Sequence, residues 1–177
     1  MTDVHTGQVL SMVARMVRPA TVLELGTFSG YGTLCLLEGL APDGALHTVE
    51  RNDELFALQD EFWGQHERKE AIIRHHGQAL DVLAKWPATL PIDLAYIDAD
   101  KQGVIDQLNA LLPRMAIGGW ILFDNTWWSG TLPEAEGPKP DALRALNTRL
   151  QSDPQLLTAV LPVGDGLSIA QVMSGAR

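Results

Sequence analysis

Short hydrophobic runs recur along the chain, and longer stretches between them place apolar residues at the period of a helix. Runs of five to seven residues that are rich in Val, Ile and Leu are typical of strands. The pattern predicts seven strands, at Thr21–Leu25, Ala45–Glu50, Ala71–His76, Ile92–Asp98, Trp120–Asp124, Leu156–Leu161 and Leu167–Val172. Because strands that alternate with helices form parallel sheets covered on both faces, we expect a doubly wound α/β fold.

The last two strands depart from this alternation. The segment that joins them, Pro162–Gly166, is only five residues long and contains two glycines and an aspartate. A connection of this length and composition is typical of a hairpin, in which the two strands are antiparallel. We therefore expect a seven-stranded sheet that is mostly parallel and has one antiparallel strand.

Amphipathic stretches bounded by Asn, Gly or Pro predict the helices. They lie at Val4–Val17, Tyr31–Leu40, Asp53–Trp63, Lys101–Leu111 and Asp141–Leu150. The segment Gly130–Pro140 is rich in Pro, Gly and acidic residues and follows a strand. We expect it at the carboxyl edge of the sheet, where folds of this kind bind ligands.

Composition narrows the class of protein. A chain of 177 residues, 46% hydrophobic and 20% charged, suits a single globular domain over residues 1–177. A net charge of −9 argues against nucleic acid and anionic membranes as partners, and no apolar run is long enough to span a bilayer. The only cysteine, Cys35, excludes an intrachain disulfide and is expected to be a core thiol. Without a signal sequence, we expect a cytoplasmic protein.

The first candidate site is a glycine-rich turn after the first strand, in Leu23–Gly32 (LELGTFSGYG). Glycine lets the backbone approach a ligand closely, and the helix that follows offers free N–H groups. The segment matches neither G-x-G-x-x-G nor a Walker sequence. A nucleoside without phosphates is therefore the favoured ligand, although a plain strand–helix turn has the same pattern.

Glu50 ends the second strand and is the second candidate. A carboxylate at this position of a dinucleotide-binding fold accepts hydrogen bonds from ribose hydroxyls. A solvated glutamate at a strand end is the alternative, but its pairing with the glycine turn favours ribose binding. NAD and S-adenosylmethionine both remain possible ligands at this point.

Acidic residues and an amide end two further strands. Asp98 and Asp100 precede Lys101, and Asp124 with Asn125 follows the next strand. Neighbouring parallel strands lie about 4.8 Å apart, so these side chains can converge on one ion. Two carboxylates and an amide carbonyl are hard oxygen ligands, which suit Mg²⁺, Mn²⁺ or Ca²⁺ rather than zinc.

Taken together, these motifs resemble the metal- and S-adenosylmethionine-dependent O-methyltransferases of the catechol and caffeoyl-CoA type. The resemblance runs from about His5 to Met173 and rests on VLELGTFSGYGTL, HTVE, HHGQALDVL, IDLAYIDADK, GGWILFDNTWWSG and LPVGDGLSIA. It implies a Rossmann-like fold, S-adenosylmethionine as cofactor, a divalent metal with Mg²⁺ favoured, and a small aromatic hydroxyl substrate. It also implies a homodimer.

The resemblance also implies roles for individual residues. Asp98, Asp124 and Asn125 correspond to metal ligands, and Lys101 to a general base toward the reacting hydroxyl, although a fixed cation is the alternative for this lysine. Asp98 is also expected to contact the cofactor's amino group. The expected cofactor-binding residues are Glu24, Gly26, Thr27, Phe28, Ser29, Tyr31, Gly32, Glu50, Arg51, Gly77, Gln78, Ala79, Asp98 and Asp100.

The acceptor is expected to be catechol-like, since adjacent hydroxyls could both ligate the metal. Trp127 and Trp128 could form an aromatic wall for its ring, or serve in packing or a dimer contact. Family members have a further helical stretch before the segment that matches Val4–Val17. We therefore expect a more open active site, or one that another chain closes.

Two other functions stay open on the sequence alone. A nicotinamide-dependent dehydrogenase would share the glycine turn and the ribose-binding carboxylate, and a non-catalytic module could retain the cofactor fold. The five histidines are expected to have no special role. His75 and His76, adjacent on one strand, point to opposite faces and cannot chelate one metal together.

Overall fold

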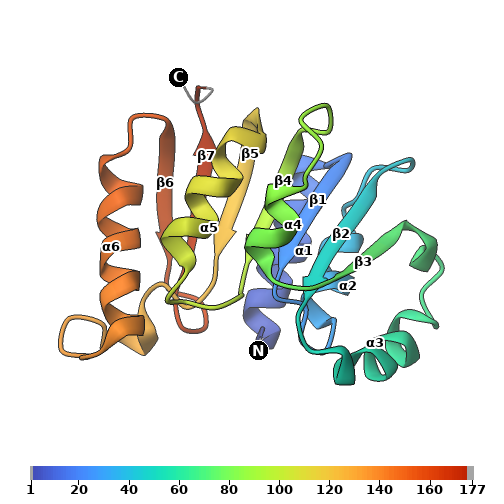
Figure 1. Ribbon diagram of the computed structural model, residues 1–177, viewed down its shortest axis with the longest axis horizontal. Coiled ribbons are helices and arrows are strands. Elements are labelled where there is room, and N and C mark those ends of the chain that lie inside the picture. Colours follow the sequence, from blue (N-terminus) through green and yellow to red (C-terminus); the bar gives the residue numbers. More distant parts are fainter. Residues whose placement is uncertain (1, 175–177) are drawn as a thin grey trace.

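A computed structural model describes residues 2–174 of the chain, and within them it contains one seven-stranded sheet (Figure 1). The strand order is β3-β2-β1-β4-β5-β7-β6. The strands are β1 (Thr21–Leu25), β2 (Ala45–Glu50), β3 (Ile72–His76), β4 (Ile92–Ile97), β5 (Met115–Phe123), β6 (Leu156–Leu161) and β7 (Leu167–Val172). The seven predicted strands are thus confirmed.

Strand directions follow the expected pattern. Strands β1 to β5 pair in parallel, and β7 pairs antiparallel with both β5 and β6. The strand order reverses next to β1, where the chain crosses from β3 to β4, and this crossing opens the carboxyl edge of the sheet (the lower edge in Figure 1). The doubly wound, Rossmann-like fold with one antiparallel strand is confirmed.

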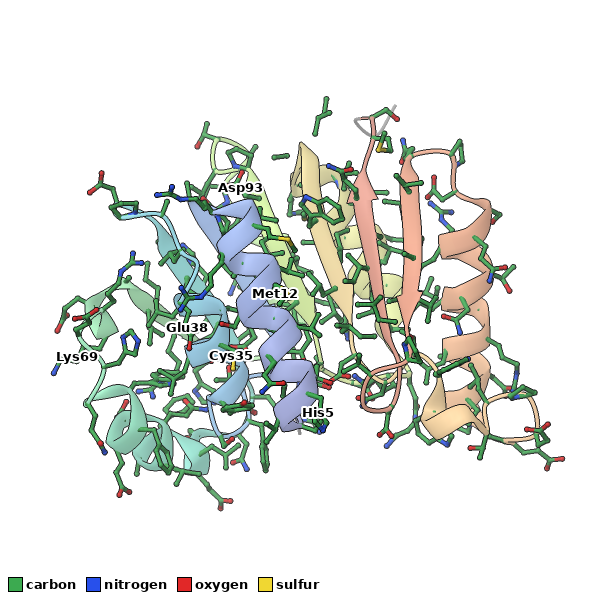
Figure 2. The ribbon with its side chains drawn as sticks, turned by 180° about the vertical axis from the view of Figure 1, so that it is seen from behind. His5, Met12, Cys35, Glu38, Lys69 and Asp93 are labelled. Carbon is green, nitrogen blue, oxygen red and sulfur yellow. The ribbon has the colours of Figure 1, made fainter. Side chains whose placement is uncertain are left out.

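Helices cover both faces of the sheet. Helices α1 and α2 lie on one face, which Figure 2 shows from the front, and α4, α5 and α6 lie on the other, which faces the viewer in Figure 1. The α-helices are α1 (Val4–Val17), α2 (Tyr31–Leu37), α3 (Phe56–Trp63), α4 (Ala79–Ala84), α5 (Val104–Leu111) and α6 (Pro138–Ser152). Short 3₁₀ turns span Asp53–Leu55, Lys69–Ala71, Leu112–Arg114 and Trp128–Gly130.

The chain has a separate apolar core on each side of the sheet. Leu10, Leu36 and Leu94 lie in the core beneath α1 and α2. Ile97 and Leu108 lie in the larger core beneath α4, α5 and α6. Cys35 is buried in the first core, as expected. Since both cores share one sheet, the strand ends that carry the polar residues are held between two packed layers.

Several boundaries differ from the sequence-based prediction. Helix α4 is absent from the predicted helices, because its six residues are too few to show a clear helical period. Strand β5 begins at Met115 rather than Trp120, because two glycines hide its first half in the sequence. One of them, Gly119, is required there, since a Cβ would lie 2.9 Å from the Ala116 carbonyl oxygen. Helix α5 begins at Val104, three residues later than predicted, because residues 101–103 form a turn.

The structure also bears on location. Over residues 2–174, no helix combines the length and apolar character that a membrane span needs. A cytoplasmic location stays a prediction.

Candidate active site

A cleft of about 400 Å³ opens at the carboxyl edge of the sheet, beside the ends of β1, β2, β4 and β5. Most of the expected site residues lie on its wall, although they come from five separate parts of the chain. They are Gly26, Phe28, Glu50, Arg51, Gly77, Gln78, Ala79, Asp98, Asp100, Lys101 and Asn125. The fold therefore brings the glycine turn, the β2 carboxylate and the acidic cluster to one place.

Gly26 lets two turns cross closely at the base of this cleft. Its φ is +96°, and a Cβ there would lie 2.7 Å from the backbone carbonyl carbon of Asp98. Its N–H donates to the Val49 carbonyl oxygen at 3.0 Å. Since both the positive φ and the close approach favour glycine, this position fixes how near the ends of β1 and β4 can come.

Glu50 is held by the backbone. Its Oε2 accepts a hydrogen bond from the Phe28 N–H at 2.8 Å, and its Oε1 accepts one from the Asn52 N–H at 2.9 Å. Each carboxylate oxygen keeps a further lone pair for another donor. The geometry therefore presents a fixed, preoriented acceptor to the cleft, as binding of a diol requires.

Glu24, by contrast, does not reach the cleft wall. The side chain lies beneath the glycine turn, where its Oε2 accepts hydrogen bonds from the hydroxyls of Thr33 and Thr48. Complete burial raises the pKa of Glu24 to about 8, and the nearby charges of Asp98 and Glu50 add to the rise. This residue is therefore mostly protonated at neutral pH and supports the turn from below.

The other expected cofactor residues off the wall belong to the same turn and helix. The Thr27 hydroxyl is hydrogen-bonded to that of Thr48. Gly32 packs so closely against Glu24 that a Cβ at this position would lie 2.6 Å from the Glu24 Oε1 atom. Tyr31 faces the groove between α1 and α2, and Ser29 lies half-buried within the turn. The structure thus places these side chains around the turn rather than in the cleft.

The acidic cluster occupies the other end of the cleft. The Lys101 Nζ donates to Asp98 Oδ1 at 2.9 Å, and both side chains are mostly buried. Asp124 lies just behind the wall, where its Oδ2 accepts from the Tyr96 hydroxyl at 2.7 Å and its Oδ1 from the Asn125 N–H at 2.8 Å. Burial raises the pKa of Asp124, and the charge of Asp98 raises it further. The two carboxylates are thus close enough to repel each other.

This cluster has a donor set that suits a hard cation. Asn125 has a φ of +60°, which asparagine tolerates, and its Nδ2 points to Asp165 Oδ2 at 3.4 Å. In that orientation the Asn125 Oδ1 atom can serve as an oxygen ligand to a metal ion. Within residues 2–174 no metal-binding group of three or more His, Cys, Asp or Glu side chains occurs, since the expected set has only two carboxylates and an amide.

The two tryptophans after Asn125 differ in environment. Trp127 is about half exposed, whereas Trp128 packs against the core beneath α6. Neither lies on the cleft wall. Trp128 therefore serves in packing, which was one of the two expected roles. Contact of Trp127 with the substrate ring or with a partner chain stays a prediction.

Gln107 and Lys139 lie on the cleft wall, and the sequence analysis missed both. Lys139 is an exposed residue near the start of α6. Gln107 is almost wholly buried on α5, between the core residues Val104, Leu108 and Leu111. A signal for Gln107 does exist in the sequence, because a polar residue at this spacing interrupts the apolar face of a helix.

Two histidines form an unexpected pair outside the cleft. His47 Nδ1 lies 2.9 Å from His75 Nε2, with the rings stacked, and the edge of Trp86 packs on His47. Burial lowers the pKa of His47 to about 4 and also lowers that of His75. The pair joins β2 to β3, a contact that the sequence analysis did not predict.

The fold and the cleft define the class of protein: a Rossmann-like α/β protein with a cleft at the carboxyl edge of its sheet. A family model described as "O-methyltransferase" matches residues 1–173. The chain therefore belongs to the O-methyltransferase family, whose members transfer the methyl group of S-adenosylmethionine. Neither the dehydrogenase alternative nor the non-catalytic module gains support from this comparison.

Individual relatives agree with this membership. The caffeoyl-CoA O-methyltransferase of Stellaria longipes is 31% identical over 96% of this chain and 75% of its own. A putative O-methyltransferase from Klebsiella pneumoniae is 25% identical, with a TM-score of 0.90 over 98% of this chain and 82% of that chain. The O-methyltransferase TomG of Streptomyces achromogenes, solved with S-adenosylmethionine, has the same TM-score and coverage at 24% identity, which shows the shared fold.

Proposed function

We propose that this O-methyltransferase depends on a divalent metal and methylates a hydroxyl of a small, catechol-like aromatic compound. One observation carries the proposal. The oxygen donors of Asp98, Asp124 and Asn125 end two neighbouring strands, at the opposite end of the cleft from Glu50. A site of this kind can hold a methyl donor and an oxygen nucleophile side by side.

The half of the cleft around β1 and β2 would hold the cofactor. Glu50 accepts the ribose hydroxyls, and the backbone at Gly26 lies under the methionine portion. Gly77, Gln78 and Ala79 border the base, while Asp98 receives the amino group. The support for these roles is the position of these residues on one continuous wall and the fixed orientation of the Glu50 carboxylate.

The other half would hold the metal and the acceptor. Asp98, Asp124 and Asn125 offer hard oxygen ligands. Burial, and after it the charge of Asp98, raises the pKa of Asp124, and a dication would offset both effects by stabilising the ionised carboxylates. Mg²⁺ is favoured, with Mn²⁺ and Ca²⁺ as alternatives. When bound, such an ion lowers the pKa of a coordinated hydroxyl and so makes the oxygen a better nucleophile.

Lys101 would act on the acceptor hydroxyl. Its ion pair with Asp98 holds the amine at the cleft wall, between the two halves. In this position it either takes the hydroxyl proton or stays a fixed cation beside the developing charge. Positioning of the oxygen in line with the methyl carbon and sulfur supplies the remaining rate enhancement.

We also propose that residues 1–177 act as one domain and that the chain forms a homodimer. One sheet shared by both cores supports the single domain. Exposed apolar residues on α1 support the dimer, since Val4, Met12 and Met16 have more than half of their surface exposed (Met12 is labelled in Figure 2). Sedimentation velocity of the purified chain measures the oligomeric state directly.

The experiment that tests the function measures methyl transfer from S-adenosylmethionine to a panel of catechols, phenols and aliphatic alcohols. We expect turnover of catechols with Mg²⁺, and its loss with EDTA. Turnover that persists in EDTA contradicts the metal, and transfer to phenols alone contradicts the catechol class. Thermal shift with S-adenosylhomocysteine and with NAD is the control, and stabilisation by NAD alone contradicts the cofactor.

A further inference from the structure

One buried polar atom on the cleft wall has no hydrogen-bond partner within residues 2–174. It is the Oε1 atom of Gln107, a residue that is only 3% exposed. The same side chain donates from its Nε2 to the Asp100 carbonyl oxygen at 3.0 Å. This bond fixes the amide orientation, because a flipped amide would leave both the Asp100 carbonyl and the Gln107 N–H without a partner.

A buried carbonyl without a donor is costly, so proteins seldom retain one unless water or a ligand satisfies it. Gln107 borders the cleft, and three small apolar side chains, those of Val49, Ala79 and Ala99, line the same cleft. Such a wall suits the face of a flat ring. A planar heterocycle with an N–H group on its edge fits both features.

The cofactor of the proposed function carries such a group. Its ribose hydroxyls are assigned to Glu50 and its ammonium group to Asp98, which leaves the 6-amino group of adenine as the remaining strong donor. We propose that Gln107 is a specificity-determining residue whose Oε1 accepts a hydrogen bond from this 6-amino group. This inference rests on the proposed function and adds a residue that selects the base.

Gln107 has a second, structural role that the test must separate from the first. Its Nε2 holds the turn that carries Asp100 and leads into Lys101. Loss of that bond would weaken binding of any ligand of the cleft. Recognition of the base instead changes the ratio of affinities between two ligands that differ only at the 6-position.

The experiment is isothermal titration with S-adenosylhomocysteine and with its analogue that has hydrogen in place of the 6-amino group. We expect the wild-type chain to prefer S-adenosylhomocysteine by about tenfold or more, and Gln107→Leu to lose about tenfold of that preference. Gln107→Met matches the length of the side chain and replaces the leucine variant if that variant does not fold. Gln107→Glu keeps an acceptor oxygen and is expected to keep the preference.

Glu50→Gln is the matched control, because both ligands share the ribose and this variant should weaken them equally. An equal loss for both ligands in Gln107→Leu overturns the inference and leaves only the structural role, with an ordered water on Oε1. A wild-type chain without a preference overturns it as well. A wild-type chain that binds neither ligand contradicts the proposed function instead.

Discussion

The two ends of the cleft are built in different ways. At the end near β2, backbone N–H groups hold the Glu50 carboxylate, and the crossing at Gly26 is set by the backbone itself. At the end near β5, charged side chains face one another, and the pKa of Asp124 is raised by burial and by the charge of Asp98. The first end holds one acceptor in a fixed orientation, whereas the second brings two carboxylates close to each other.

This difference teaches which steps each end controls. A prearranged acceptor contributes to binding affinity, since little ordering is left for the ligand to induce. If the acidic cluster binds a metal, as proposed, it contributes to the chemical step and makes turnover depend on metal concentration. Variants at the two ends should therefore separate cofactor affinity from metal-dependent turnover.

The largest effect is expected for Asp124→Asn. Replacement of the carboxylate by a neutral amide should lower turnover in saturating Mg²⁺ by about a thousandfold, because weaker binding and poorer positioning of the metal remove several kcal/mol of stabilisation. Affinity for S-adenosylhomocysteine should change little. Initial rates over a series of Mg²⁺ concentrations, together with calorimetric titration of the cofactor product, measure both quantities.

The control for Asp124→Asn is Asp43→Asn, which removes the same charge from an exposed turn before β2. This control should retain full activity. If Asp124→Asn keeps its rate and its response to Mg²⁺, the metal assignment is wrong. An equal loss of cofactor affinity would instead show that the two ends do not act separately.

Lys101→Ala comes second in expected size. Proton transfer by a positioned side chain typically contributes about a hundredfold or more, so kcat should fall by about that factor while KM changes less. Lys101→Arg keeps the positive charge but cannot accept a proton at neutral pH. A pH profile of kcat for both variants therefore distinguishes a base from a fixed cation.

A base is supported if the arginine variant is as slow as the alanine variant. A fixed cation is supported if arginine restores most of the rate. The exposed Lys85 provides the matched control, since Lys85→Ala removes a lysine outside the cleft. An unchanged kcat in Lys101→Ala would leave the residue no chemical role.

Glu50→Gln tests the other end of the cleft. The glutamine keeps one acceptor oxygen but loses the charge, and hydrogen bonds to charged groups are stronger than neutral ones. We expect the dissociation constant of S-adenosylhomocysteine to rise by about tenfold, with or without Mg²⁺. If the loss appears only in the presence of the metal, the two ends are coupled.

The strand ends were the most predictable part of the molecule. Asp98, Asp124 and Glu50 each follow a buried run, and parallel strands carry such residues to one edge. Their shared position at one edge of the sheet follows from strand order rather than from local sequence. This part of the site could therefore be predicted once a parallel sheet was expected.

Other features depend on register and packing that no short segment contains. The His47–His75 pair joins residues 28 positions apart and needs the alignment of Val49 with His75 across β2 and β3. The sequence shows Gln107 as a polar residue on an apolar helix face, but the bond of its amide to the Asp100 carbonyl oxygen exists only in the fold. Glu24 appears on the sequence as part of a cofactor motif, but strand alternation turns its side chain toward α2.

The smallest effect on ligand binding is expected for Glu24→Gln, because this residue lies beneath the turn. Affinity for S-adenosylhomocysteine should stay within about twofold of the wild-type value. Stability should respond instead. The folded-state pKa of about 8 exceeds the ordinary value of 4.5, so the folded chain retains a proton that the unfolded chain releases. This contribution to stability is fully present below pH 4.5 and is lost as the pH rises to about 8.

Glu24→Gln should remove that dependence, because glutamine does not titrate. The wild-type chain should lose about 2–4 kcal/mol relative to the variant between pH 4.5 and pH 8. Urea unfolding in EDTA at three pH values measures the difference, with Glu61→Gln on the exposed face of α3 as the control. Parallel pH curves of stability for Glu24→Gln and the wild-type chain would show that Glu24 is ionised in the folded chain. A tenfold loss of cofactor affinity in the variant would show that Glu24 contributes to cofactor binding.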